Sequence, residues 1–160
     1  MNPTDNFSEI KQEILDRARR AEACRPEYGR AAAETLGDLC TVIKDNFNWC
    51  CRNGVIDAPL LEKYKEDFAA CDIYVNTDAE RGFLLCDGNA TVEACGNATV
   101  EAYDNATVVA CFNATVRAYD NAYCSSWSLI ECKLSDNALY RVRSTNTVYY
   151  ANDNIKFQKQ

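Results

Sequence analysis

A repeated eight-residue phrase is the feature that most constrains how this chain folds. Four near-copies follow one another without a gap, and they begin at Asn89, Asn97, Asn105 and Asn113. A fifth, more divergent copy begins at Asn121. A short fixed period indicates a stacked architecture, in which each unit buries its apolar side chains only against its neighbours.

Residue types alternate within the phrase. Its second, fourth and sixth positions are Ala, Val and Ala, whereas its third position is Thr and its fifth is mostly charged. Successive strand residues point to opposite faces, so we expect the first set to point inward and the second outward. Continued in steps of eight, this register predicts eight half-turns from about Arg81 to Ser144, followed by an irregular closing coil that includes Tyr149 and Phe157. Ser126 is the inward position least suited to burial.

Two architectures are compatible with an eight-residue period. An antiparallel meander would mix Ala and Val with Thr and Glu on each face, so no apolar face would form. A parallel β-solenoid keeps the same side of every strand inward. The seventh position alternates as Cys95, Tyr103, Cys111 and Tyr119, which repeats at sixteen residues and favours two strands per coil. A three-sided coil of twenty-four residues is the alternative.

The N-terminal part of the chain has helical periodicity. Residues 7–24 place apolar side chains at spacings of three and four, which predicts a first helix. A second is expected over about residues 27–44, with a bend near Asp45 and a continuation that ends before Gly54. A third is predicted to begin after Asp57, a good N-cap residue.

These patterns define the expected fold class and domain organisation. The fold class is α+β, with a three-helix domain over residues 1–72 and a parallel β-solenoid domain over residues 73–160. The solenoid has two strands, each from an eight-residue phrase, in every coil. We expect the helices to cap the first coil, because an exposed sheet edge promotes aggregation.

The charge of the chain is acidic and uneven. The formal net charge is −7. Residues 73–131 carry two Lys or Arg against eight Asp or Glu, whereas residues 132–160 carry five against two. Direct binding to nucleic acid or to anionic membranes is not expected, because such binding needs clustered positive charge. The plain explanation of the acidity is solubility. The alternative is an acidic face that competes with nucleic acid for a basic partner protein.

Cysteine usage and the N-terminus indicate a reducing compartment. The chain has ten Cys and no His. It has no signal-peptide pattern and no run of about 20 apolar residues, so we expect it in the reducing cytoplasm, with most thiols buried. Cys95 and Cys111 would lie near disulfide distance in a two-strand coil, but parallel side chains make the bond geometry unfavourable.

Enzymatic chemistry is not expected. Without His no Ser–His–Asp set can form, no glycine-rich phosphate loop follows a strand, and no CxxC pair is present. The corners have too few Asp and Gly for a calcium-binding β-roll, and charged residues interrupt the Thr rows that ice-binding solenoids use. We therefore expect no catalytic residues, no metal and no cofactor.

Six outward residues of the repeat are the candidates for binding a partner. They are acidic or aromatic side chains that project from the solenoid surface: Glu93, Glu101, Tyr103, Asp104, Tyr119 and Asp120. In the two-strand coil Tyr103 would stack on Tyr119, and Glu101 would lie beside Arg117.

The run Asn-Ala-Thr-Val-Glu-Ala-Tyr/Cys resembles octapeptide β-solenoid tracts in uncharacterised proteins of gut bacteria and their phages. The preceding segment, from Asn48-Trp49-Cys50-Cys51 through Leu60-Leu61 to Ile73-Tyr74-Val75, is similar to the small helical region that often precedes such tracts. The resemblance covers about residues 36–143 and implies no catalytic residues.

The resemblance leads to two functional hypotheses. By analogy of fold and charge with anti-CRISPR proteins, a small acidic phage-like protein would inhibit a host defence or nucleic-acid-handling complex through its acidic solenoid surface. The alternative is a structural solenoid that forms homo-oligomers in a virion or a surface assembly. A weaker third idea is a small-molecule pocket between helices and solenoid.

Overall fold

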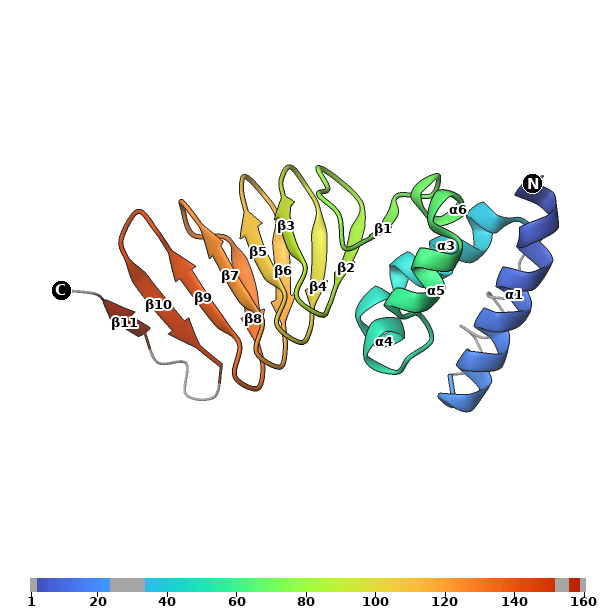
Figure 1. The fold of residues 1–160 in the computed structure, drawn as a ribbon, viewed down its shortest axis with the longest axis horizontal. Helices are drawn as coiled ribbons and strands as arrows, with labels where there is room; N and C mark the ends of the chain where they lie inside the picture. Colours follow the sequence, from blue (N-terminus) through green and yellow to red (C-terminus); the bar gives the residue numbers. More distant parts are fainter. Residues whose placement is uncertain (1–2, 24–33, 152–155, 159–160) are drawn as a thin grey trace. The chain divides into compact units, whose positions relative to one another are not determined.

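The chain folds into a helical unit followed by a β-solenoid, which confirms the α+β class (Figure 1). The structure, a computed structural model, describes residues 3–23, 34–151 and 156–158. The chain divides into two compact units, Met1–Ile73 and Tyr74–Gln160. Each unit is described by itself below.

The helical unit has more helix breaks than the sequence pattern predicts. Its described helices are α1 (Pro3–Arg20), α3 (Leu36–Asp45), α4 (Phe47–Arg52), α5 (Ala58–Lys63) and α6 (Lys65–Ala69). The bend predicted near Asp45 is a break at Asn46, which ends α3 and begins α4. The predicted third helix is interrupted at Tyr64. The beginning of the second, predicted near residue 27, lies outside the described residues.

Caps and apolar stripes explain the helices that form. The Thr35 hydroxyl accepts a hydrogen bond from the Asp38 amide at the start of α3, and the Asp57 carboxylate accepts one from the Leu60 amide at the start of α5. Each helix then buries one face. The largest fully buried side chains of this unit are Ile10, Ile14, Leu39, Ile43, Val55, Ile56, Leu61, Phe68 and Ile73.

The second unit is a parallel β-solenoid with two strands per coil. Its eight consecutive strands are β2 (Phe83–Cys86), β3 (Thr91–Ala94), β4 (Thr99–Ala102), β5 (Thr107–Ala110), β6 (Thr115–Ala118), β7 (Tyr123–Ser126), β8 (Glu131–Leu134) and β9 (Leu139–Val142). Even-numbered strands, preceded by β1 (Ile73–Val75), form one sheet, and odd-numbered strands form the other (Figure 1). Both the meander and the coil of twenty-four residues are thereby excluded.

The strand register follows the sixteen-residue period. Val92 pairs with Val108, Val108 with Cys124, and Cys124 with Tyr140, all in parallel strands. The inward Ala-Val-Ala set is buried as predicted, including Val92, Val100, Val108 and Val116. The dry interior is shared by all four coils, so its small side chains are what hold the two sheets together.

Ser126 is buried in spite of its hydroxyl, because that hydroxyl has partners. The Ser126 Oγ lies 2.7 Å from the Ser128 carbonyl oxygen and 2.5 Å from the Tyr140 hydroxyl. The Tyr140 hydroxyl also accepts a hydrogen bond of 3.0 Å from the Ile130 amide. The polar groups inside this coil therefore satisfy one another, as buried polar groups must.

The end of the solenoid differs from the predicted closing coil. After a turn with Asn146 in the left-handed conformation, strand β10 (Thr147–Tyr150) runs antiparallel to β9. Strand β11 (Lys156–Gln158) then pairs antiparallel with β10. The chain therefore turns back along the edge of the sheet formed by β3, β5, β7 and β9, and β10 and β11 extend this sheet in antiparallel orientation. The parallel register of the repeats does not predict these two strands.

Candidate functional site

The corners that follow the even-numbered strands carry a row of aspartates. Asp104, Asp120 and Asp136 are exposed, and each has a positive φ between 54° and 56°. Asp tolerates this left-handed conformation better than most residues. Gly88 occupies the same corner one coil before Asp104, with φ 59°. We call Asp104, Asp120 and Asp136 the aspartate row.

Each carboxylate of the aspartate row is tied to the coil before it. The Oδ2 atoms of Asp104, Asp120 and Asp136 accept hydrogen bonds of 3.0, 3.0 and 3.1 Å from the backbone amides of Gly88, Asp104 and Asp120, respectively. The row therefore links four successive coils. It also holds three negative charges in line, about 4.8 Å apart, which is the spacing of neighbouring strands.

The tyrosine pair lies directly beside this row. Tyr103 precedes Asp104 and Tyr119 precedes Asp120, and the two rings stack with centroids 4.7 Å apart. The stacking predicted from the sixteen-residue period is confirmed. Tyr119 is buried and Tyr103 is half-buried. The pair therefore packs against the corner and offers a partner protein little exposed surface.

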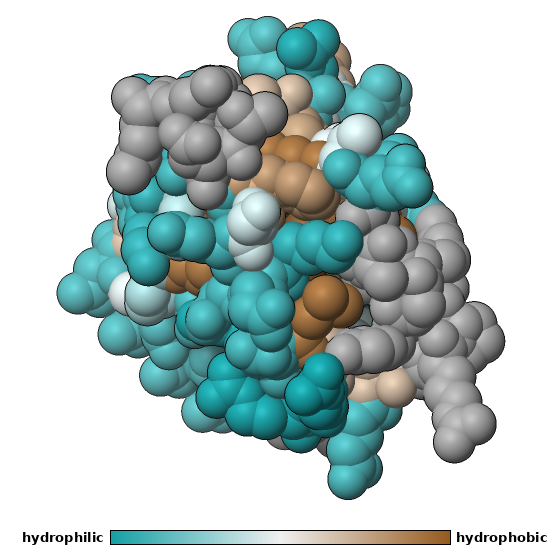
Figure 2. Space-filling view, turned by 90° about the vertical axis from the view of Figure 1, so that its right-hand side faces the viewer, coloured by the Kyte–Doolittle hydropathy of each residue, from teal (hydrophilic) through white to brown (hydrophobic). Residues whose placement is uncertain are grey.

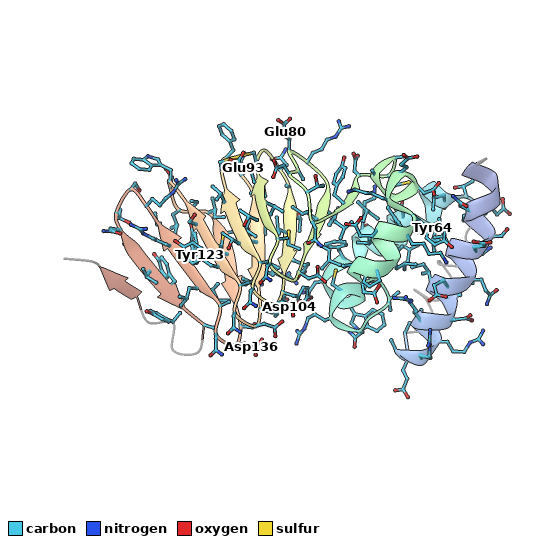
Figure 3. All side chains as sticks on the ribbon, viewed as in Figure 1. Tyr64, Glu80, Glu93, Asp104, Tyr123 and Asp136 are labelled. Atoms are coloured by element: carbon cyan, nitrogen blue, oxygen red, sulfur yellow. A yellow bond between two sulfur atoms is a disulfide. The ribbon has the colours of Figure 1, made fainter. Side chains whose placement is uncertain are left out.

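Glu101 and Glu93 do not join the aspartate row. Glu101 is on the outer side of β4, in register with Leu85 and Arg117, but it is only 1% exposed. Its carboxylate is therefore not available at the surface. Glu93 is exposed on β3 in the other sheet, and Figure 3 shows Glu93 and Glu80 at the edge of the solenoid opposite Asp104 and Asp136.

The six candidates from the sequence thus separate into three groups. Asp104 and Asp120 belong to the aspartate row. Tyr103, Tyr119 and Glu101 are buried or half-buried near it. Glu93 is exposed on the opposite edge of the solenoid. Asp136 belongs to the row but was not among the candidates. Its signal was present, because Asp136 follows Asp120 by the same sixteen residues that separate Asp120 from Asp104.

A cysteine pair closes the opposite corner. Cys95 and Cys111 lie at disulfide distance, as predicted from the two-strand coil, and are joined by a disulfide with Cα atoms 4.7 Å apart. Cys86 and Cys124 are buried inside the solenoid. Burial raises the pKa of the Cys86 thiol to about 12, with a smaller contribution from Asp87. A hydrogen bond with Cys132, together with burial, raises the pKa of Cys124. Both thiols are therefore protonated at neutral pH and unsuited to nucleophilic chemistry.

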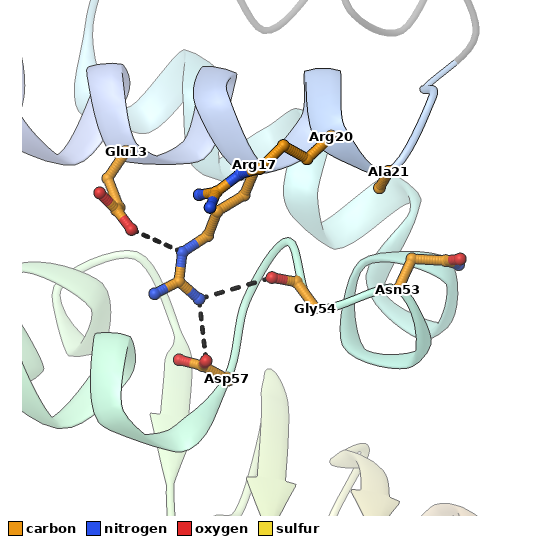
Figure 4. Close-up of a pocket in the computed structure, with 7 residues that line it drawn as sticks. All are labelled: Glu13, Arg17, Arg20, Ala21, Asn53, Gly54 and Asp57. Carbon is orange, nitrogen blue, oxygen red and sulfur yellow. Dashed lines mark hydrogen bonds and ion pairs between the residues drawn. The ribbon is translucent and has the colours of Figure 1, made fainter.

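Two open depressions lie side by side on the described part of the helical unit. One, of about 410 Å³, is lined by the residues shown in Figure 4, and the other, of about 680 Å³, lies beside it around Lys63 and Tyr64. Figure 2, which faces this unit, shows a mainly hydrophilic surface with hydrophobic atoms in recesses between polar side chains. Neither depression combines an apolar lining with converging polar groups, which is the usual character of a ligand pocket.

Arg17 explains the polar character of the smaller depression. Its guanidinium lies 2.8 Å from a Glu13 carboxylate oxygen and 2.9 Å from an Asp57 carboxylate oxygen, and it donates a bond of 3.4 Å to the Gly54 carbonyl (Figure 4). The side chain therefore joins α1 to the turn before α5. Two carboxylates compensate the charge of Arg17. We therefore interpret this side chain as a structural link between the two elements and not as a binding site for an anion.

Among the residues that the structure describes, no group of three or more Cys, Asp or Glu is arranged to hold a metal ion. Among the helices the structure describes, none is long and apolar enough to cross a membrane.

The chain was compared with known proteins. We found no match to a protein-family model, to a curated protein or to a solved structure. The candidate site therefore rests on its geometry, and the aspartate row is its best-defined element.

Proposed function

We propose that this protein is a non-enzymatic inhibitor that binds a basic, nucleic-acid-handling host protein through the aspartate row. By its resemblance to octapeptide solenoids of gut bacteria and their phages, we place it in phage or prophage anti-defence, in the manner of anti-CRISPR proteins, acting in the bacterial cytoplasm. The partner site consists of Asp104, Asp120 and Asp136.

The spacing of the aspartate row is the observation that supports this proposal. One charge every 4.8 Å or so approaches the charge density of a nucleic-acid strand, which carries about one phosphate per 3.4 Å of helix axis. Each carboxylate is held in place by a backbone amide. A basic groove that binds phosphates can therefore meet a rigid row of carboxylates without the entropy loss of ordering flexible side chains.

The test uses a variant that removes charge but keeps the corner. In Asp104→Asn/Asp120→Asn/Asp136→Asn, the amide oxygens still accept the three backbone hydrogen bonds, so the coils stay linked. The control removes three exposed charges from the helical unit: Glu22→Gln, Glu34→Gln and Glu66→Gln.

The measurement is binding to identified proteins from a bacterial lysate. Immobilised full-length protein is expected to recover a nucleic-acid-binding protein, to compete with that protein's nucleic acid, and to release it as salt rises from about 50 to 300 mM. We expect the triple Asn variant to bind at least tenfold more weakly and the Gln control to bind normally. Equal binding by the Asn variant, or a partner with no affinity for nucleic acid, would contradict the proposal.

A further inference from the structure

Three of the large apolar side chains exposed on the described part of the solenoid lie at neighbouring corners. Phe112, Trp127 and Leu129 are 80%, 64% and 67% exposed. Phe112 follows β5, and the other two follow β7, so all three lie at corners after odd-numbered strands. We call these three residues the apolar edge.

The coil period places the apolar edge in two neighbouring coils. Residue 128, between Trp127 and Leu129, is sixteen positions after Phe112, and β5 and β7 are paired in parallel. The corners that carry these side chains therefore belong to adjacent coils, whose strands are about 4.8 Å apart. Large apolar side chains exposed on adjacent coils are a candidate interaction surface.

Charge changes sign along the same line of corners. Two coils before Phe112 is Glu80, whose carbonyl accepts a hydrogen bond from the Asn97 amide of the next coil. Glu93 is nearby on the same edge, as Figure 3 shows. Two coils after Phe112 is Arg143, whose amide bonds to the Ser126 carbonyl of the coil before. Exposed acidic side chains (Asp78, Glu80 and Glu93) thus outnumber the one exposed cation, Arg81, before the apolar centre, and Arg143 follows it.

The shape of the edge also changes from one side of Phe112 to the other. The corner one coil before Phe112 is Gly96, which has no side chain. The corner one coil after it carries both Trp127 and Leu129. The corner without a side chain and the corner with two large side chains are therefore each one coil from Phe112. Glu80 and the corner at residues 143–144 are each two coils from it.

We propose that two copies of this chain pair through the apolar edge in antiparallel orientation, about a two-fold axis near Phe112. This arrangement places the two Phe112 rings together at the centre. It sets Trp127 and Leu129 of each copy over the bare Gly96 corner of the other, and it brings each Arg143 near the other copy's Glu80. A parallel arrangement would place like charges and bulky corners against one another. The residues on this edge are self-complementary, as an isologous interface requires.

The area involved sets the expected strength. The exposed parts of these three side chains from two copies contribute roughly 1,000 Å², which is near the lower limit for a specific interface. The dimer is therefore expected to dissociate in the micromolar range rather than to be permanent. The inference does not depend on the proposed function, because the aspartate row is on the opposite edge.

The first test measures molar mass by analytical ultracentrifugation of the full chain without reductant, which keeps the Cys95–Cys111 bond intact, and a non-reducing denaturing gel excludes disulfide-linked dimers. Between about 1 and 200 μM the mass is expected to rise from 18.0 kDa towards twice that value. We expect Phe112→Ser and Trp127→Ser to raise the dissociation constant at least tenfold. Both side chains are largely exposed, so the circular dichroism spectrum should not change. Trp49→Ser, which removes an exposed aromatic ring from the helical unit, is the matched control and should leave the dimer intact.

The second test addresses orientation. Glu80→Arg and Arg143→Glu are each expected to weaken the dimer and to flatten or reverse its salt dependence. Combined in one chain they should restore it, because a two-fold axis brings the two positions together from different copies. A monomer at 200 μM, a dimer insensitive to Phe112→Ser and Trp127→Ser, or a mass that grows beyond a dimer would overturn the proposal. Failure of the double swap to restore the dimer would overturn the antiparallel arrangement.

Discussion

Replacing Gly96 with Ala tests how closely adjacent coils approach at a corner. Gly96 and Gly88 both have left-handed backbones, with φ of 60° and 59°. A Cβ atom at Gly96 would lie 2.2 Å from the backbone oxygen of Glu80, whereas a Cβ at Gly88 would meet nothing within 4 Å. The two glycines therefore share the conformational requirement and differ in the space around them.

The expected magnitudes follow from these two terms. Left-handed backbone costs a non-glycine residue about 1–2 kcal/mol, partly offset by the reduced freedom of the unfolded chain. We expect Gly88→Ala to lower the free energy of unfolding by about 1 kcal/mol. Gly96→Ala adds a clash with backbone, and forced overpacking typically costs another 1–3 kcal/mol. Its total is therefore expected near 2–4 kcal/mol.

Urea unfolding followed by circular dichroism measures both values. For a slope of about 1–3 kcal/mol/M, the difference between the two variants corresponds to a midpoint shift on the order of 1 M. Equal midpoints for Gly88→Ala and Gly96→Ala would refute the close approach of Glu80 to Gly96. A larger loss for Gly88→Ala would refute the assignment of the two corners altogether.

Four further predictions follow from the same structure. Val108→Ala, inside the solenoid, should lower the free energy of unfolding by about 2–3 kcal/mol, whereas Val109→Ala on the outer face should change it by less than about 1 kcal/mol; similar urea midpoints would contradict the inward register. Asp120→Ala should lower it by about 1 kcal/mol through loss of the bond to the Asp104 amide, and Asp120→Asn, which keeps an acceptor, should have a melting temperature closer to that of the original protein. Tyr140→Phe should cost about 1–3 kcal/mol, because it removes a partner of both Ser126 and the Ile130 amide; an unchanged thermal midpoint would show that these groups find other partners. The raised pKa of Cys86 means that the folded state retains a proton which the unfolded state loses near pH 9, so this contribution to stability should be complete below pH 9 and should decline between about pH 9 and 12; Cys86→Ala should reduce that decline in a pH series of urea unfolding.

The solenoid could be predicted because its signal is local and repeated. Alternation within eight residues shows which side chains point inward, and the alternation of Cys95, Tyr103, Cys111 and Tyr119 gives the coil length. Eight strands, the parallel register and the buried valines followed from these patterns, and the structure confirms them.

What could not be predicted depends on contacts between particular side chains. Ser126 is buried because Tyr140, fourteen residues away, supplies a hydroxyl, and a residue pattern cannot show that bond. Glu101 occupies an outward position and is nevertheless buried, so alternation alone does not measure exposure. The reversal at Asn146 breaks the period, and no repeat beyond it indicates which strand pairs with which.

The candidate site was only partly accessible from the sequence. Asp104 and Asp120 were selected for their charge, but their arrangement with Asp136 follows only from the corner geometry. The apolar edge was not anticipated as a unit, because Phe112 and Trp127 belong to different phrases. Their proximity depends on the sixteen-residue coil, which brings neighbouring corners together.

The hydrogen bond from each aspartate to the coil before it makes the corners interchangeable. If residues 105–120 were excised, Asp104 would join Asn121 and restore the same Asp-Asn dipeptide, and Asp136 would then accept the amide bond that Asp120 accepts now. A gene encoding such an array can therefore lose or gain sixteen codons by recombination between its own repeats, and its product remains a closed stack of a different length. Insertions whose length is not a multiple of sixteen residues would shift the aspartates out of line and leave amides at the corner without an acceptor.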